Sequence, residues 1–378
     1  MMKSARGTVL HVISGIDVGG AENHLLDLAG GLIDRGFDVT VAYLKGDGEF
    51  EQEFRDVGCT VVNIGIRHDI DPLGLARLVR YIASNEHDIV HGHLFHGNVY
   101  GTVAATLGGV PYVVASKHND PPFWRQQPYR TIHELTIQRA DRVCPISDHV
   151  HRYILTQTGV NPDDVQTIRY GLDPAPFDRV DDSDVAAVRS ELGVADDSQL
   201  IGTVARLTQQ KDLETLLRAF ALVREHRSNV QLAVVGRGER RPQLEELSEQ
   251  LSVDDSVTFA GFRSDVPVLM RAFDVFALTS RWEGFGVVLM EAMAAKTPVV
   301  ASNVSAIPEV VADGETGFMA PSGDIEAFAD RFNRLLDDGS LALALGEAGR
   351  RRLEREFSVE RMVGEMEALY RDLLAGEY

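Results

Sequence analysis

Residues 201–212 read Ile201-Gly202-Thr203-Val204-Ala205-Arg206-Leu207-Thr208-Gln209-Gln210-Lys211-Asp212. The stretch starts as a short apolar run, passes into a polar loop and continues into a helix-like segment over 212–225. Short β-branched runs alternate with longer segments of 3.6-residue period through the rest of the chain as well. This alternation is typical of parallel sheets covered by helices on both faces. We therefore predict an α/β fold with a doubly wound sheet in each half of the chain.

The expected strands fall into two groups. They span 8–13, 39–43, 60–64, 89–91, 112–115 and 142–145 in the first half, and 200–204, 231–235, 257–260, 275–278 and 298–301 in the second. The expected helices between them include 21–35, 73–85, 212–225, 241–251, 264–272 and 286–295. Asp71 followed by Pro72 is a favourable N-cap and first-turn pair for the second of these helices.

A length of 378 residues suggests two domains. The segment 173–199 is rich in Asp and Pro, so we expect it to be a linker between a first domain, 1–172, and a second, 200–356. The last segment, 357–378, is predicted to be a helix with one apolar stripe, which must dock on another surface. The stripe consists of Met362, Met366, Leu369, Tyr370, Leu373 and Leu374.

Composition excludes several classes of protein. The chain has 37 basic and 57 acidic residues, a net charge of −20, which argues against a nucleic-acid partner. No stretch reaches the roughly 18 apolar residues of a membrane helix, and the apolar run 8–13 is too short for an export signal. Cys59 and Cys144 are too few for a disulfide framework. A cytoplasmic location is therefore expected.

Arg206 and Lys211 lie five residues apart just after a predicted strand. Open α/β sheets bind ligands at the carboxyl ends of their strands. Two cations at that edge suit a diphosphate, although a solvated loop is an equally good explanation of the pair taken alone.

The second motif is Ser280-Arg281-Trp282-Glu283-Gly284-Phe285-Gly286-Val287-Val288-Leu289-Met290-Glu291. Its glycines open a helix whose first amides favour an anion. Glu283 and Glu291 are eight residues apart, roughly 12 Å along a helix and on nearly the same face. One carboxylate can meet a sugar and the other a ribose. Two surface glutamates are the alternative, but an ionised Glu291 within so apolar a helix is costly without a partner.

The first domain carries weaker motifs. Gly19 and Gly20 stand at a strand-to-helix turn, where a ligand can approach the backbone. His91, His93 and His96 follow one another at the end of a strand, but no carboxylate or cysteine nearby in sequence completes a zinc site. A histidine that contacts a sugar is the preferred interpretation. The next strand ends in Lys117-His118-Asn119, for which a capped loop remains an equal alternative.

These features, in this order, resemble the retaining glycosyltransferases of family 4, which include sucrose-phosphate synthases and phosphatidylinositol mannosyltransferases. Glu283 and Glu291 resemble the family's E-x7-E element, and Arg206 and Lys211 its diphosphate-binding pair. His91-Gly92-His93 resembles its H-x-H motif. The resemblance implies the GT-B fold, in which two Rossmann-like domains face each other across a cleft and the last helix crosses back to the first domain.

The resemblance also implies site residues. Catalytic roles would belong to His93, Arg206, Lys211 and Glu283. Donor-binding roles would belong to Gly19, Gly20, Gly236, Gly238, Phe262, Arg263, Phe285, Gly286, Val287 and Glu291. In this assignment Glu291 binds the ribose, Glu283 the sugar hydroxyls, the amides of 285–287 the phosphate, and residues 262–263 flank the base. Acceptor-side candidates are His118, Lys117 and Asn119.

The reaction implied is a hexosyl transfer that retains the anomeric configuration, with a UDP-sugar as the first expectation for the donor and GDP-mannose as the second. Asp-x-Asp spacing at 69–71 and 182–184 is explained by helix capping and by the linker. We therefore expect no metal and no other cofactor, with Arg206 and Lys211 supplying the positive charge instead.

The acceptor is a hydroxyl of unknown type, for which a lipid-linked or polysaccharide precursor is one expectation. Residues 117–152 mix arginines with Phe123, Trp124 and Tyr129, which fits either a peripheral contact with the inner face of a membrane or an ordinary solvated surface. The alternatives to a transferase are a UDP-sugar 2-epimerase and a non-catalytic sugar-nucleotide-binding subunit. An NAD enzyme is disfavoured because no G-x-G-x-x-G follows the first strand.

Overall fold

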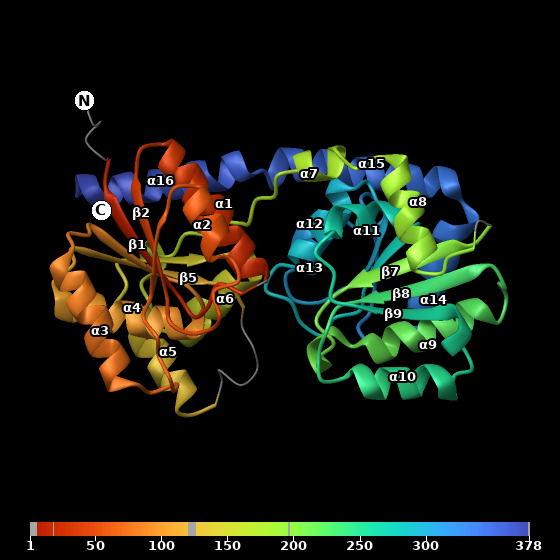
Figure 1. Ribbon diagram of the computed structural model, residues 1–378, viewed down its shortest axis with the longest axis horizontal. Coiled ribbons are helices and arrows are strands. Elements are labelled where there is room, and N and C mark those ends of the chain that lie inside the picture. Colours follow the sequence, from red (N-terminus) through yellow and green to blue (C-terminus); the bar gives the residue numbers. More distant parts are fainter. Residues whose placement is uncertain (1–5, 18, 120–125, 196, 377–378) are drawn as a thin grey trace. The chain divides into compact units, whose positions relative to one another are not determined.

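The computed structural model describes residues 6–17, 19–119, 126–195 and 197–376. The chain divides into two compact units (Figure 1). Unit 1 comprises Met1–Gly171 and Ser358–Tyr378, and unit 2 comprises Leu172–Phe357. Each unit contains one six-stranded parallel sheet flanked by helices, as the alternation in the sequence predicts. None of the described helices is long and apolar enough to cross a membrane.

The sheet of unit 1 has the order β3-β2-β1-β4-β5-β6, which is the doubly wound order 3-2-1-4-5-6. Its strands are β1 Thr8–Ile13, β2 Asp38–Tyr43, β3 Thr60–Asn63, β4 Ile89–Gly92, β5 Tyr112–Lys117 and β6 Arg142–Pro145. The chain leaves β1 toward one edge and β4 toward the other, so the carboxyl ends of β1 and β4 form the switch point at which such sheets bind ligands.

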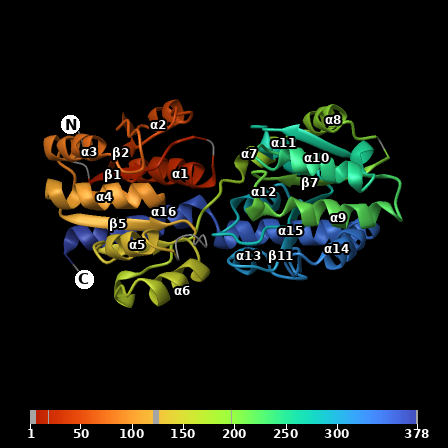
Figure 2. The ribbon, with the colours of Figure 1, turned by 90° about the horizontal axis from the view of Figure 1, so that it is seen from below.

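Helices cover both faces of this sheet (Figures 1 and 2). On one face, α1 Gly20–Asp34 and α16 Val359–Ala375 pack against each other and share one apolar cluster with the sheet. On the other face lie α3 Pro72–Ser84, α4 Leu94–Gly108 and α5 Tyr129–Ile137. Unit 1 also contains α2 Glu51–Asp56 and α6 Asp148–Gln157. The carboxylate of Asp71 accepts a hydrogen bond from Gly74 N at 2.9 Å, so it caps α3 as predicted.

The predicted apolar stripe of α16 is buried in unit 1. Met362, Met366, Leu369, Tyr370 and Leu373 are each at most 3% exposed. They join residues of β1, β2 and α1 in the same cluster. A helix that follows unit 2 in the sequence therefore completes the core of unit 1.

Unit 2 repeats the same strand order, here β12-β11-β10-β7-β8-β9. Its strands are β7 Gln199–Val204, β8 Val230–Val235, β9 Val257–Gly261, β10 Val275–Leu278, β11 Val299–Ser302 and β12 Phe318–Ala320. Its helices include α9 Leu213–Arg224, α10 Arg241–Gln250, α11 Val266–Ala272, α12 Val287–Ala294, α13 Ile307–Val310, α14 Ile325–Asp337 and α15 Gly339–Glu356. The neighbours β7 and β10 are parallel, so their carboxyl ends meet at the switch point of this sheet.

The segment 173–199 is not an extended linker. It contains α7 Ala175–Asp178 and α8 Asp182–Glu191, and α8 packs against α11 within unit 2. Val188 on α8 and Leu192 just after it are buried. The Asp181 carboxylate accepts hydrogen bonds from the amides of Ser183 and Asp184. The aspartates made this segment look like a linker in composition. Three of them, however, are the N-cap of α8, Asp181, and residues of its first turn, Asp182 and Asp184.

Candidate active site

The two motifs of unit 2 meet at the switch point of its sheet. One occupies the loop after β7 and the other the loop after β10. The Thr279 hydroxyl contacts the carbonyl oxygens of both Lys211 and Asp212 at 3.0 Å. The Gln210 amide donates to the carbonyl of Trp282 at 2.9 Å. Side chains and backbone therefore hold the two loops together.

Lys211 and Glu283 form a direct ion pair. Lys211 Nζ lies 2.5 Å from Glu283 Oε1, and the hydroxyl of Ser280 donates to the same oxygen at 2.6 Å. The two charged side chains are only 14% and 8% exposed, respectively. From the sequence, Lys211 is assigned to the diphosphate and Glu283 to the sugar of a ligand. In the structure, the two side chains also neutralise each other's charge.

A second ion pair, between Asp212 and Arg281, also connects the loop after β7 to the loop after β10. Asp212 has a left-handed backbone, with φ of 47°, and its carboxylate accepts from Arg281 Nη2 at 3.0 Å. Arg206 is different, since its side chain is exposed and makes no hydrogen bond or ion pair with another described residue. Of the two predicted phosphate ligands, the side chain of Lys211 is held in place by Glu283, whereas that of Arg206 is bound to no other described residue.

Helix α12 presents its N-terminus beside this ion pair. Its N-cap, Gly286, has φ of 89°, a conformation that favours glycine. The first amides of a helix lack intrahelical partners and carry the positive end of the helix dipole. Glu291 lies on the second turn and is partly buried, and its carboxyl group has no hydrogen-bond or ion-pair partner among the described residues. Burial raises the pKa of this carboxyl to about 7.

Gly236 and Gly238 hold the loop after β8 against the loop that carries Arg206. A Cβ on Gly236 would lie 1.9 Å from the carbonyl oxygen of Ala205, and one on Gly238 would lie 2.3 Å from that of Leu207. The Leu207 amide also donates to the carbonyl of Arg237 at 2.9 Å. Close backbone packing therefore accounts for these two glycines, and their predicted place in a nucleotide pocket stays a prediction.

The predicted base-flanking residues differ in accessibility. Phe262 is 46% exposed, and the guanidinium carbon of Arg237 lies 5.1 Å from the centre of its ring. Arg263 is engaged in ion pairs with Asp265 and Glu191. Sequence reasoning missed Arg237, although it stands between the two glycines of the same loop.

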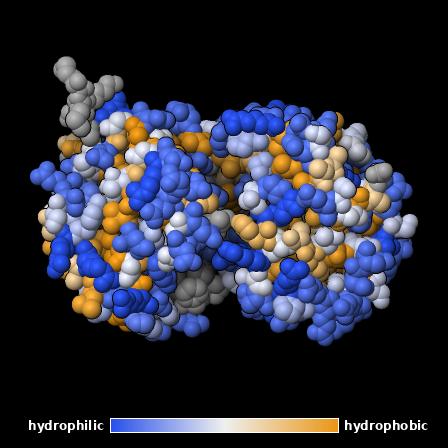
Figure 3. All heavy atoms as spheres, viewed as in Figure 1, coloured by the Kyte–Doolittle hydropathy of each residue, from blue (hydrophilic) through white to orange (hydrophobic). Residues whose placement is uncertain are grey.

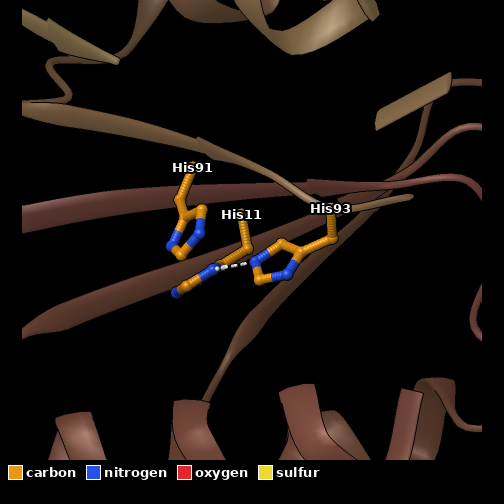
Figure 4. Close-up of side chains that lie close together, drawn as sticks. All are labelled: His11, His91 and His93. Atoms are coloured by element: carbon orange, nitrogen blue, oxygen red, sulfur yellow. Dashed lines mark hydrogen bonds between the residues drawn. The ribbon is translucent and has the colours of Figure 1, made fainter. Parts of the chain in front are cut away.

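In unit 1 the predicted histidines belong to a buried network (Figure 4). His11 of β1 and His91 of β4 are partners in the strand register, and His93 follows two residues later. Hydrogen bonds join His11 Nδ1 to His93 Nε2 at 2.9 Å, His93 Nδ1 to His118 Nε2 at 3.1 Å, and His118 Nδ1 to the Tyr170 hydroxyl at 2.5 Å. Both ring nitrogens of His93 are thus engaged.

His91 makes a separate set of contacts. Its Nδ1 meets the hydroxyl of Tyr370 on α16 at 2.5 Å, and its Nε2 meets the hydroxyl of Ser116 at 2.8 Å. His11 and Tyr170 were not singled out from the sequence, and Tyr370 was placed only in the apolar stripe of the last helix. The sequence held one signal for His11. It stands within the apolar run 8–13, and a polar side chain in a buried strand needs a hydrogen-bond partner.

The network is electrically neutral. Burial lowers the pKa of His11 and of His118 to about 3, and lowers the pKa of His91 and His93 well below its ordinary value. Each neutral imidazole donates from one nitrogen and accepts at the other. The three hydrogen bonds that run from His11 through His93 and His118 to Tyr170 can therefore form together only if every group in the series donates toward the same end of it.

Nitrogens of His11, His91 and His93 lie within 4.8 Å of one another, close enough to consider a metal. However, the rings of His91 and His93 are stacked, with centroids 4.2 Å apart and planes 29° apart. Imidazole lone pairs lie in the ring plane, so those of stacked rings do not converge on one ion. His96, the third histidine of the sequence motif, lies 3.2 Å from Asp69 instead. The described geometry is that of a hydrogen-bonded stack.

The remaining predicted residues of unit 1 lie at the carboxyl edge of its sheet. Lys117 ends β5 and is 1% exposed, and burial lowers its pKa well below its ordinary value. Asn119 stands two residues after Lys117, just before residues outside the described part. Gly19 is the N-cap of α1, with extended backbone, and Gly20 is the first residue of that helix. Their roles toward donor and acceptor stay predictions.

Comparison with known proteins agrees with this architecture. Residues 18–176 match the family model described as Glycosyltransferase Family 4, and residues 184–352 match the one described as Glycosyl transferases group 1. The alpha-maltose-1-phosphate synthase of Mycolicibacterium smegmatis is 32% identical over 313 residues, which are 76% of this chain and 79% of that protein. The D-inositol 3-phosphate glycosyltransferase of Corynebacterium glutamicum is 25% identical over 96% of this chain and 93% of its own.

Solved structures show the same fold. The structure of Anabaena HepE in complex with UDP-glucose superposes with a TM-score of 0.84 at 25% identity, covering 96% of this chain and all of that one. Sucrose-phosphate synthase from Thermosynechococcus elongatus gives a TM-score of 0.83 at 24% identity, covering 98% of this chain and all of that one. With its two doubly wound sheets and its paired motif loops, the chain belongs to glycosyltransferase family 4 and has the GT-B fold.

Proposed function

We propose that this glycosyltransferase takes its sugar from a nucleoside diphosphate sugar bound at the carboxyl edge of the sheet of unit 2. The observation that carries the proposal is the pairing of Lys211 with Glu283 at 2.5 Å, next to the N-terminus of α12. An ammonium group has three N–H donors, so Lys211 can hold Glu283 and a phosphate oxygen at the same time. Arg206, exposed and uncommitted on the same loop, supplies a second cation.

A UDP-sugar is the first choice of donor and GDP-mannose the second. The structures of HepE in complex with UDP and with UDP-glucose support the uracil base. In this proposal Glu291 accepts hydrogen bonds from the ribose hydroxyls, Glu283 meets the sugar, and the exposed ring of Phe262 lies beside the base.

The proposed chemistry is a transfer with retention of configuration and without a metal. The bond between the anomeric carbon and the β-phosphate oxygen breaks as the bond to the acceptor oxygen forms on the same face of the sugar. The proton of the acceptor hydroxyl passes to the leaving phosphate. Negative charge that grows on the diphosphate is stabilised by Lys211, Arg206 and the first amides of α12.

The proposed acceptor is a hydroxyl group on a lipid-linked or polysaccharide precursor. A relative named as a capsular polysaccharide biosynthesis glycosyltransferase, from Staphylococcus aureus, supports this class at 32% identity over 47% of the chain. We further propose that the protein meets such acceptors at a membrane surface through unit 1.

The test is nucleotide release from a panel of UDP- and GDP-sugars, with and without pooled acceptors and with and without EDTA. We expect UDP release that depends on an acceptor and is unchanged by EDTA, and an α-linked product from an α-linked donor by NMR. Inversion at C2 of the donor without nucleotide release would instead indicate an epimerase. Nucleotide binding without turnover on any acceptor would indicate a binding subunit.

A further inference from the structure

The outer side of the helix layer α3–α4–α5 is unusually apolar. The inner sides of these helices pack on the sheet of unit 1. Ten large apolar residues in the described part of the chain are exposed, and seven of them lie on this layer or at its start. They are Ile70 at 85% exposure, Leu73 at 74%, Val103 at 39%, Leu107 at 66%, Tyr129 at 42%, Ile132 at 36% and Leu135 at 56%.

These side chains form one surface. Helix α4 contacts both α3 and α5, and Figure 2 shows the three helices side by side. On α5 the exposed residues Tyr129, Ile132 and Leu135 follow one another at three-residue spacing, which places them on one face of the helix. In Figure 3 apolar side chains gather over the part of unit 1 where Figure 1 shows α3 and α4. We call this surface the α3–α5 face.

The charges on this layer differ in sign from those of the whole chain. The chain has a net charge of −20, but the three helices carry three arginines and one carboxylate. That carboxylate, Glu134, is already paired with Arg130 at 2.7 Å. Arg80 on α3 and Arg139 just after α5 are exposed and form no hydrogen bond or ion pair through their side chains with other described residues. Uncommitted cations thus flank the apolar surface.

The arginines share an end of the layer with two exposed leucines. Helices of a doubly wound sheet run antiparallel to its strands, so their C-terminal ends lie at the same edge. Leu107 is in the last turn of α4, between α3 and α5, and Leu135 is near the end of α5. Ile70, Leu73 and Tyr129 stand at the other ends of the helices, at the carboxyl edge of the sheet.

We propose that the α3–α5 face docks on an anionic membrane, with Leu107 and Leu135 entering the boundary between headgroups and acyl chains and Arg80 and Arg139 binding lipid phosphates. This deepens the proposed function, because it identifies where unit 1 would meet the surface that presents a lipid-linked acceptor. Apolar side chains between arginines are the pattern of a helix surface that lies in a membrane interface.

Charge favours a membrane over a second copy of the chain. In a self-contact the three helices of the face would offer the arginines no unpaired carboxylate, because Glu134 is already paired with Arg130. Anionic lipid supplies the missing negative charge.

The experiment is flotation with vesicles of phosphatidylcholine alone and of phosphatidylcholine with one quarter phosphatidylglycerol, at low and at 300 mM salt. We expect binding to the anionic vesicles, weakened by salt, and loss of that binding in Leu107→Glu with Leu135→Glu. Leu343→Glu is the matched control, because Leu343 is 64% exposed on α15 of unit 2.

The arginines are tested separately. Arg80→Ser and Arg139→Ser should each weaken binding to anionic vesicles about fivefold, whereas Arg351→Ser, at an exposed arginine of α15, should leave it unchanged. Nucleotide release with a water-soluble acceptor should be unaffected in all these variants, so a failure of docking and a failure of the proposed reaction are told apart.

Three results would overturn the proposal. The first is that the wild type does not float with anionic vesicles at low salt, and the second is that the double leucine variant floats with them as well as the wild type. The third is that the wild type sediments as a dimer and the double leucine variant as a monomer. Circular dichroism and thermal melting of the variants confirm that the substitutions at these exposed positions leave the fold intact.

Discussion

At the scale of single residues, the Lys211–Glu283 ion pair is a contact that neither sequence motif reveals on its own. The sequence motifs place a cation for phosphate and a carboxylate for sugar 72 residues apart. Only the neighbouring positions of β7 and β10 bring the two side chains to 2.5 Å. Either residue is therefore held in place by the other before any substrate arrives.

We predict that Glu283→Gln and Lys211→Met each destabilise unit 2 by about 3 kcal/mol, because each leaves a nearly buried charge without its partner. The double variant should recover most of that stability. Turnover should fall by about 10² to 10³ in all three. Urea unfolding and nucleotide release measure the two effects.

Glu347→Gln is the control for this prediction, since it breaks an exposed pair with Lys296 and should change stability by less than about 1 kcal/mol. Strictly additive losses in the double variant would show that the Lys211–Glu283 contact contributes nothing to stability.

We predict that affinity for a UDP-sugar falls as the pH drops below about 7. Burial raises the pKa of Glu291 to about 7, and its ionised form accepts hydrogen bonds from ribose hydroxyls more strongly than its protonated form, which carries a hydrogen on one oxygen. Below that pKa the loss is at most about tenfold per pH unit. Calorimetric titration between pH 5.5 and 8.5 measures it, and a UDP-sugar is preferable to UDP because its diphosphate does not titrate in this range.

Glu291→Gln should bind more weakly at pH 8 and show a flat pH profile. A profile in this variant as steep as that of the wild type would assign the titration to another group and remove Glu291 from the ribose.

At the scale of elements, β1, β4 and β5 determine which histidines meet. The sequence shows His91 and His93 at a strand end, but the partners His11 and His118 come from the two strands that flank β4. Strand order is a long-range property that a local pattern does not contain. The sequence therefore predicted the histidines as a site and could not predict that both nitrogens of His93 are engaged.

We predict that unit 1 loses stability in mild acid. The pKa of His11 and of His118 is lowered from 6.5 to about 3 in the folded protein, so the unfolded chain binds more protons below pH 6.5. Stability is then present above pH 6.5 and declines as the pH falls toward 3, by about 2.7 kcal/mol per pH unit for the two residues together. Urea unfolding between pH 4.5 and 7.5 gives the slope.

Replacing His11 and His118 by Asn should reduce that slope, whereas His68→Asn, at an exposed position, should not. An acid slope of the wild type no steeper than that of an ordinary protein of this size would contradict the prediction even if the double variant fails to fold.

The loop after β8 yields another prediction at this scale. Gly236→Ala would place a Cβ 1.9 Å from the carbonyl of Ala205, so we expect a loss of stability of about 3 kcal/mol and weaker donor binding through the displaced Arg206 loop. Gly314→Ala also has a positive φ, 75°, but meets no atom within 4 Å, so it should lose only about 1 kcal/mol. Equal losses in the two variants would show that backbone strain, and not the clash, sets the effect.

At the scale of the whole molecule, composition and periodicity were sufficient for the architecture. The expected strands recur within a residue or two at each end, because buried β-branched runs are a local signal. The three-residue strand β12 was missed, being too short to show a period. The segment 173–199 was misread because capping aspartates and linker aspartates look alike in composition, and burial of Val188 and Leu192 distinguishes them only after folding.

The fold brings together the residues that the sequence singled out in unit 2, whereas those of unit 1 belong to a network that the sequence did not indicate. Arg206, Lys211, Glu283 and Glu291 stand in two continuous stretches beside glycine turns, and these stretches meet at the switch point. The network of unit 1 draws on β1, β4, β5, the segment before Gly171 and α16. Five separate segments leave no single stretch in which a pattern could be recognised.

The return of α16 to unit 1 has a consequence for how the polypeptide matures on the ribosome. Residues 172–357 are contiguous, so unit 2 can close as soon as it has emerged, while the α1 side of unit 1 waits for a helix translated afterwards. At usual elongation rates that delay is on the order of 10 to 40 seconds. Throughout this interval the nascent chain exposes an apolar surface that a chaperone can bind, and the second half of the enzyme is finished before the first.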